Sequence, residues 1–430
     1  MKQLFQYEFG VYWNKDKIIK AGNKIMKPIV RAGRMKPVHS DIRGPLFVEA
    51  MKRQKQGIDI LKLNTGNPAT FGFGLPDSIK NALMEHMQDG VGYCDFKGMP
   101  QARQAICDYE TSKDIKGITS DDVFIGNGVS EVVSFALTPL LNDGDEVLVP
   151  SPSYSLWGNS IYLEGGKPVF YTCDEKANWY PDIKDIRSKI TDKTKAIVII
   201  NPNNPTGVLY PKELLLEIIQ IARESGLLIF ADEIYDRLVM DGKQHISLAS
   251  LTEDVPVITL NGLSKSHCLC GYRCGWMVIS GPRELTEDYR QGIIQLTSLR
   301  LCANTMAQIV IPAALDDMDT PASMVRPGGR IYEQREATVR ELEKINGLSF
   351  VKNDAAFYVF PKLDVKKFNI TNDKQFAHDL LDATNILLVP GSGFDWKDPD
   401  HFRIVMLPQA DILSDAIRRM GTFLDGYKQK

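Results

Sequence analysis

Lys265 is a candidate for covalent chemistry because it follows a predicted strand. Residues 257–260 are apolar and predict a buried strand, so the lysine should stand where the chain leaves a sheet. A lysine amine condenses with an aldehyde if its surroundings hold it partly deprotonated, because the ammonium form has no lone pair. Arg273 lies eight residues later, beside glycines, and its guanidinium could hold a phosphate oxyanion near the same lysine. Taken alone, a lysine and an arginine in one loop are more often two solvated charges.

Three more polar residues follow predicted strands. Asn204 comes after the apolar run 195–200, and Asp232 and Tyr235 come after the run 227–231. These strand ends recur roughly thirty residues apart, which is about the length of one βαβ unit. In a parallel sheet, the loops beyond the carboxyl ends of the strands converge on one crevice. We therefore expect these side chains to share a pocket with the lysine and the arginine.

A glycine-containing loop marks a candidate phosphate site. Residues 123–125 predict a strand that runs into the loop 126–130 and then into an apolar helix. Free amide N–H groups and the positive end of a helix dipole would point at one place there. The loop is neither a Walker loop nor a complete dinucleotide fingerprint, and a tight turn between strand and helix has the same pattern.

Together these residues fit a phosphorylated aromatic aldehyde that bears a ring nitrogen. Asp232 would keep the ring nitrogen protonated, so that the ring accepts electrons from a bond broken on the substrate. Asn204 and Tyr235 would hold the ring hydroxyl. Lys265 would bind the aldehyde and, once a substrate amine displaces it, would carry a proton as general acid and base.

Composition excludes several other classes of function. The 430 residues, 43% of them hydrophobic, are enough for about two or three domains with sizeable cores. The 51 basic and 54 acidic side chains give a net charge of -3, which argues against nucleic acid as a partner. Seven irregularly spaced cysteines favour reduced thiols. Without a long apolar run or a secretory signal, we expect a cytoplasmic protein with no membrane partner.

The predicted elements divide the chain into four segments. Residues 61–325 predict a large α/β domain that binds the cofactor on a mostly parallel sheet. Residues 326–430 alternate long polar helices with short strands and predict a smaller α+β domain, which residues 38–60 should join. Residues 1–37 are rich in lysine and arginine. They predict either a targeting segment or an ordered arm that packs on the body or on another subunit.

Several motifs resemble those of the class I aminotransferases of fold type I, which use pyridoxal 5'-phosphate. The similarity runs over about residues 38–423. Flanking residues 201–205, 298–304 and 327–330 look most like the bacterial glutamate-pyruvate (alanine) aminotransferases. The motifs are Asn204-Pro205-Thr206-Gly207, Asp232-Glu233-Ile234-Tyr235, Ser264-Lys265 with Arg273, and Phe402-Arg403-Ile404.

The resemblance implies a fold and an activity. The large domain should hold a mostly parallel sheet of the seven-stranded type between helices, and the enzyme should be a homodimer with sites shared across the interface. It should exchange an amino group between an L-amino acid, alanine or glutamate, and a 2-oxo acid, pyruvate or 2-oxoglutarate, by ping-pong chemistry.

The resemblance also implies residue roles. Lys265 would bind the cofactor aldehyde, Asp232 would face the ring nitrogen, and Asn204 and Tyr235 would contact the phenolic oxygen. Arg403 would grip the substrate α-carboxylate in a bidentate pair, near Asn204 and the Gly66 amide. Tyr154 matches the aromatic residue that stacks on the ring, and Tyr93 matches a tyrosine that reaches the phosphate of the neighbouring subunit. The phosphate-binding residues would be Ser264, Arg273, Gly128, Val129 and Ser130.

The sequence departs from the family pattern at two places. Gly262 stands where many relatives have a serine directed toward the phosphate, which would weaken that contact. A cluster of one histidine and three cysteines follows the lysine, but its spacing matches no common zinc pattern, so we expect small core residues and no metal. We also expect Glu233 to be structural, since neighbouring strand-end positions face opposite ways. The cluster consists of His267, Cys268, Cys270 and Cys274.

Other functions stay open at this point. The same core residues could serve an aminotransferase for aspartate, aromatic or branched-chain substrates, or a carbon-sulfur lyase, because they do not determine which bond to Cα breaks. A cofactor-bound regulatory protein without turnover is a further alternative, but the chain lacks a helix-turn-helix extension.

Overall fold

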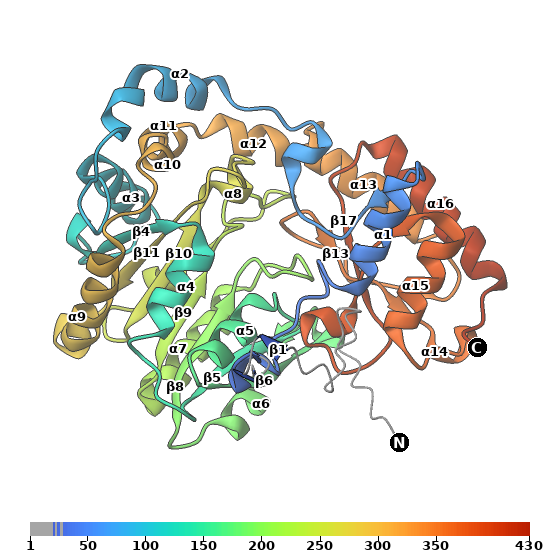
Figure 1. Cartoon of the computed structure of the whole chain (residues 1–430), viewed down its shortest axis with the longest axis horizontal. Coiled ribbons are helices and arrows are strands. Elements are labelled where there is room, and N and C mark those ends of the chain that lie inside the picture. The colour runs from blue at the N-terminus through green and yellow to red at the C-terminus, as the bar shows by residue number, and fades with distance from the viewer. Residues whose placement is uncertain (1–19, 22–23, 26–28) are drawn as a thin grey trace.

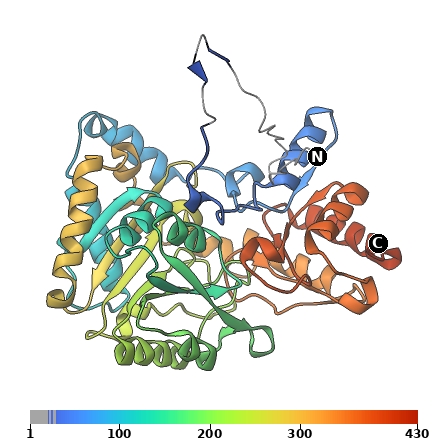
Figure 2. The ribbon, with the colours of Figure 1, turned by 60° about the horizontal axis from the view of Figure 1, so that its bottom comes forward.

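The computed structural model describes residues 20–21, 24–25 and 29–430. The prediction of an ordered arm rests on the alternating apolar residues Phe5, Tyr7, Phe9, Val11 and Trp13, which lie outside this range. Figure 1 shows a large part built on one sheet, beside a smaller part that contains the C-terminal helices. Figure 2 shows helix α1 among the C-terminal elements of the smaller part.

An eight-stranded sheet organises the large part. All pairings are parallel except those of β11 with its two neighbours and that of the short edge strand β7 with β6. The expected α/β class with a mostly parallel sheet is therefore confirmed, and the two-residue strand β7 adds an eighth strand to the expected seven. The order across the sheet is β4 (Val123–Asn127), β11 (Cys274–Ser280), β10 (Val257–Gly262), β9 (Leu228–Asp232), β8 (Thr194–Ile200), β5 (Glu146–Ser151), β6 (Lys167–Asp174) and β7 (Tyr180–Pro181).

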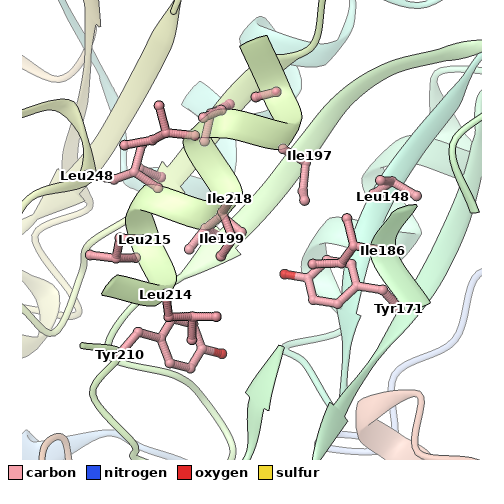
Figure 3. Close-up of a cluster of buried hydrophobic side chains, with 14 of the residues drawn as sticks. Leu148, Tyr171, Ile186, Ile197, Ile199, Tyr210, Leu214, Leu215, Ile218 and Leu248 are labelled. Atoms are coloured by element: carbon pink, nitrogen blue, oxygen red, sulfur yellow. The ribbon is translucent and has the colours of Figure 1, made fainter. Parts of the chain in front are cut away.

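Helices cover both faces of this sheet. The side chains of β8 alternate, so Ile197 and Ile199 pack beneath α6 and α7, while Val198 and Ile200 pack against α4, α5 and α9. Figure 3 shows the first of these two layers, with Leu214, the neighbouring Leu215 and Ile218 of α7 directed at the sheet. The covering helices are α4 (Val129–Leu137), α5 (Leu156–Leu163), α6 (Ile183–Lys189), α7 (Lys212–Ser225) and α9 (Arg283–Arg300).

Helix α7 illustrates how local sequence sets an element. Its apolar side chains recur on one face and are buried, and Gly226 ends the helix with a φ of 64°. Pro211 is the N-cap residue of this helix. The remaining helices of the large part and its border are α2 (Asp77–His86), α3 (Pro100–Ser112), α8 (Leu263–Ser266), α10 (Thr305–Ile309), α11 (Ile311–Asp316) and α12 (Asp319–Val325).

The smaller part consists of short strands and longer helices. Strand β17 (Phe402–Val405) lies between β13 (Tyr358–Val359) and β16 (Val389–Pro390), antiparallel to both. Strand β3 (Leu61–Lys62) pairs in parallel with β15 (Ile386–Leu387), so the N-terminal share of this part extends past residue 60. The other elements are α1 (Pro45–Lys55), α13 (Arg330–Leu342), β12 (Leu348–Ser349), β14 (Lys362–Leu363), α14 (Val365–Phe368), α15 (Asp373–Thr384) and α16 (Ala410–Gly426).

Two further observations concern the ends of the chain and its helices. Strands β1 (Lys20–Ala21) and β2 (Lys24–Ile25) form an antiparallel pair. Within the described ranges, no single helix is both long and apolar enough to cross a membrane, and only the bent combination of α9 with α10 and α11 passes by length and composition.

Candidate active site

Lys265 stands just beyond the carboxyl end of β10. It lies in the one-turn helix α8 rather than in the loop that the sequence indicated. Its Nζ donates a hydrogen bond to the Gly66 carbonyl oxygen at 2.9 Å and lies 3.9 Å from the Cys270 Sγ. Gly66 has no room for a side chain, because a Cβ would collide with Tyr358 and Phe357. The lysine therefore meets the N-terminal loop at a point of close backbone approach.

The surroundings of Lys265 favour its ammonium form. Burial is the largest influence and lowers the pKa, but Tyr358, Cys270 and Tyr154 together outweigh it, and the pKa is raised. The pKa of Lys265 in the free chain therefore reflects a balance between burial and these neighbouring side chains.

Asp232 is the last residue of β9 and is almost fully buried. Its Oδ2 accepts a hydrogen bond from the Trp157 Nε1 at 3.1 Å, and its Oδ1 accepts one from the Ile234 amide at 3.4 Å. Burial raises the pKa of this carboxyl to about 6, against the lowering effect of the two donors. The neighbouring Glu233 adds to the rise and Lys265 opposes it, so the amine and the acid share one electrostatic environment.

Tyr235 is buried on the same side and pairs with a second tyrosine. Its hydroxyl lies 2.7 Å from the hydroxyl of Tyr358, and the two rings pack edge to face at 5.6 Å. Burial raises the pKa of Tyr235 well above its ordinary range, so the phenol stays neutral and can donate a hydrogen bond.

Arg403, in β17, is a fully buried cation. Its guanidinium donates to the Asn204 Oδ1 at 2.9 Å and to the Asn64 carbonyl oxygen, and lies 4.5 Å from the ring centres of Tyr358 and Phe394. No carboxylate of the described residues forms an ion pair with it. Burial lowers its pKa, which reports the cost of keeping an unpaired charge away from water. The site is thus built to receive an anion beside Asn204.

The expected phosphate loop lies at the N-terminus of α4. Gly128 has a φ of 85°, and a Cβ there would collide with the guanidinium of Arg273. Arg273 itself has a φ of 56° and donates to the Cys270 carbonyl oxygen at 3.0 Å. The arginine therefore crosses over the loop, next to the amide groups of Val129 and Ser130. Ser264 precedes the lysine at the same edge of the sheet.

Two aromatic residues of the expected site differ in their surroundings. Tyr154 is half-buried and influences the pKa values of both Lys265 and Arg403, which places it beside the two cations. Tyr93 is 84% exposed and lies between α2 and α3. Its expected contact with a neighbouring subunit stays a prediction.

The histidine and cysteine cluster after the lysine is dispersed. The His267 ring contacts the Ser266 hydroxyl and the Asp317 carbonyl oxygen, and burial lowers its pKa to about 4. Cys268 packs 3.9 Å from the sulfur of Met324, and Cys274 lies in β11. These residues form no metal-ligand group in the part of the chain that the structure describes.

Glu233 faces away from the site, as expected. Its carboxylate accepts hydrogen bonds from the Ser247 hydroxyl and the Leu248 amide and pairs with Lys113 at 2.9 Å. Asn261, at the end of β10, also directs its side chain away from the site, because its Nδ2 donates to the buried Asp236 carboxylate at 2.7 Å.

Several side chains at the site were missed by sequence reasoning. Trp157 lies three residues after Tyr154, on the first turn of α5, and this spacing could have indicated a shared face. Tyr358 sits inside an apolar strand and has the signature of an ordinary core residue. Cys270 was expected only as a small core residue, and Asn64 and Phe394 had no local signal that connects them with the arginine.

Comparisons with known proteins find similarity over most of the chain. The family described as aminotransferase class I and II matches residues 58–417. The glutamate-pyruvate aminotransferase AlaA of Haemophilus influenzae is 50% identical over 404 residues, which are 94% of this chain and 100% of that protein. A crystal structure of an aminotransferase from Escherichia coli has a TM-score of 0.92 at 46% identity, covering 94% of this chain and 100% of that chain. The structure of an alanine aminotransferase from Pyrococcus furiosus has a TM-score of 0.87 at 41% identity, and the match covers 92% of this chain and 100% of that chain.

Proposed function

Because the chain belongs to the class I and II aminotransferases, we propose that it uses pyridoxal 5'-phosphate to exchange an amino group between L-alanine or L-glutamate and the matching 2-oxo acids. The relatives at 44–50% identity named as glutamate-pyruvate or alanine aminotransferases support this choice of substrates. The observation that carries the proposal is the position of Arg403, a buried guanidinium without a carboxylate partner among the described residues, beside Asn204 and close to Lys265.

The residues present fit this cofactor. Asp232 is a buried carboxylate whose protein partners are both donors, so it can accept from a protonated ring nitrogen. Arg273 and the start of α4 offer positive charge and amide groups to a phosphate. Lys265 supplies an amine between these two ends.

The bound cofactor would supply a ring that accepts the electrons released when a bond to the substrate Cα breaks. Asp232 would hold a proton on the ring nitrogen, and Asn204 and Tyr235 would donate to or accept from the phenolic oxygen. Lys265 would remove and return the proton at the substrate Cα through its Nζ. Because its pKa is raised in the free chain, covalent attachment must first remove a proton from this amine.

Substrate binding would rest on Arg403. A planar guanidinium makes two parallel hydrogen bonds to a carboxylate, which orients the amino group of the substrate toward Lys265. Lys265 contacts the carbonyl oxygen of Gly66, and the amide of the same residue would bind the other side of the carboxylate. The tyrosine ring of residue 154 would cover the cofactor and exclude water.

We further propose a homodimer with shared sites. Tyr93 and the nearby Val91 are 84% and 77% exposed, and Leu299 is 82% exposed. Large exposed apolar side chains of this kind support an interface with a second subunit. We also propose a division into a large domain that begins after β3 and ends at residue 325, and a smaller domain made of residues 38–62 and 326–430.

A donor panel tests the reaction. Alanine with 2-oxoglutarate should yield pyruvate and glutamate in equal amounts, and glutamate with pyruvate should run the reverse reaction. Aspartate, aromatic and branched-chain donors should react more slowly. Release of ammonia with pyruvate, and no glutamate, would instead identify a lyase.

A further inference from the structure

A buried histidine immediately precedes the strand that carries Arg403. The His401 side chain is fully buried, and its ring nitrogens lie between two carboxylates. The Nδ1 is 2.7 Å from the Asp400 Oδ1, and the Nε2 is 3.5 Å from the Glu175 Oε1. Glu175 follows β6 of the large sheet, so the histidine connects the two parts of the molecule.

A lysine completes this group of charges. Lys362 pairs with Glu175 at 2.7 Å and with Asp400 at 3.4 Å. Burial lowers the pKa of His401, but its contacts with Asp400 and Glu175 outweigh burial, and the pKa is raised. A protonated imidazole therefore balances the group, with two positive and two negative side chains.

Aromatic rings enclose the imidazole. Phe360 stacks on it at 4.9 Å with an interplanar angle of 17°, and Trp179 and Trp396 present their edges at 5.1 and 5.3 Å. The Trp396 Nε1 also donates to Asp400 at 2.9 Å. These rings exclude water from the imidazole, while Asp400 and Glu175 supply the negative charge that favours its cation.

Two routes link His401 to Arg403. Residues two apart in an extended chain point to the same side, so the two side chains share one face. A second route runs through rings: Phe360 packs edge to face on Phe394 at 6.0 Å, and Phe394 lies 4.5 Å from the Arg403 guanidinium.

We propose that His401 is a positioning residue for substrate binding, which acts by holding the Arg403 guanidinium in the direction from which it meets the substrate carboxylate. The proposal rests on the function proposed for Arg403. If His401 had a purely structural role, its loss would lower the stability of the fold without specifically weakening the binding of the substrate carboxylate.

The test compares His401→Gln with wild type. We expect KM for alanine and for 2-oxoglutarate to rise roughly tenfold, which is about 1.4 kcal/mol, while kcat and cofactor affinity change little. The dissociation constant of propanoate, an unreactive carboxylate of the size of alanine, should rise by the same factor when measured by its effect on the cofactor spectrum.

Two further variants keep the test decisive. Glu175→Gln removes the partner from the large sheet and leaves Asp400 on the histidine, and it should raise the propanoate constant even if His401→Gln fails to fold. His378→Gln, a half-exposed histidine on α15 that pairs with Glu49 and Asp382, is the matched control and should change nothing.

Unchanged propanoate binding in both His401→Gln and Glu175→Gln would overturn the proposal. So would a parallel fall of kcat, cofactor affinity and melting temperature with KM unaltered. Failure of the proposed function is a separate outcome, because a wild-type protein that binds propanoate but transfers no amino group still allows its dissociation constant to be compared with those of the variants.

Discussion

The indole Nε1 of Trp157 donates a hydrogen bond to the Asp232 carboxylate across 3.1 Å. The other protein partner of this carboxylate, the Ile234 amide, is also a donor, so both contacts favour the ionised acid. Burial favours the neutral acid and outweighs these two contacts, so the pKa of Asp232 is raised to about 6. Trp157 therefore limits how far burial can raise the pKa of Asp232, the acid that we propose faces the cofactor ring.

Trp157→Phe should keep the ring packing and remove the donor. A hydrogen bond to a charged group contributes about 1.5–3 kcal/mol, so cofactor affinity should fall roughly 10- to 100-fold. The pKa of Asp232 should rise further above about 6, which moves the acid limb of kcat/KM to higher pH. Trp276→Phe, which removes an indole donor from the buried Glu110 instead, is the control and should leave the limb in place. An unshifted limb in Trp157→Phe contradicts the assignment.

Lys265→Ala should abolish the visible absorbance of the covalently bound cofactor and nearly all turnover, because its amine is the group proposed to bind the cofactor and to move the substrate proton. Spectra recorded during titration with the cofactor, with turnover under saturating alanine, measure both effects. Wild-type rates in this variant would show that another group moves the proton.

Arg403→Gln should raise KM for every carboxylate substrate. Breaking a buried charge pair costs about 2–5 kcal/mol, so the rise should be roughly 30-fold or more. Cofactor absorbance should persist. Arg290→Gln is a matched control, because Arg290 is a buried arginine that pairs with Asp122 at 2.6 Å. That variant should lose stability and keep its KM. A normal KM in Arg403→Gln would assign the carboxylate to another residue.

A subunit-mixing experiment tests the shared site. Tyr93→Ala and Lys265→Ala should each be poorly active alone. Mixed dimers contain one site that combines the intact lysine of one chain with the intact tyrosine of the other, so mixing should restore up to one active site per dimer. Measuring activity after unfolding and refolding the two variants together, and the mass of the assembly, decides the point. No gain on mixing argues against sharing.

His39 should stabilise the fold through its charge. The histidine lies 3.2 Å from Asp395 and 3.7 Å from Asp41, and hydrogen bonds with these acids raise its pKa from 6.5 to about 10. A raised pKa means that the stabilisation is complete below about pH 6.5 and is lost as the pH rises through about 10. Melting temperatures of wild type and His39→Gln should therefore differ at neutral pH and converge above that value. His86→Gln, on the surface beside Asp89, should show no such difference.

The elements of the large sheet could be predicted because their signals are local. Continuous apolar runs such as residues 195–200 form strands buried on both faces, and Gly226 ends α7. The one-turn helix α8 and the edge strand β7 were not predicted. Each is too short for a periodic pattern, and neighbouring elements stabilise it.

The candidate site divides in the same way. Asn204, Asp232 and Lys265 follow apolar runs directly, so the order of residues along the chain was enough to bring them to one edge of a parallel sheet. Their partners are distant in sequence: Trp157 lies 75 residues from Asp232, and Tyr358 lies 123 residues from Tyr235.

The sequence by itself determined the class of fold, the strand ends and the residues that stand there, because these depend on periodicity and on neighbours along the chain. Only the tertiary structure decided the direction in which the pKa of each buried side chain is shifted and which neighbouring side chains contact it. The low polarity that raises the pKa of Asp232 and the enclosure of His401 by rings and carboxylates both come from packing between segments far apart in the chain.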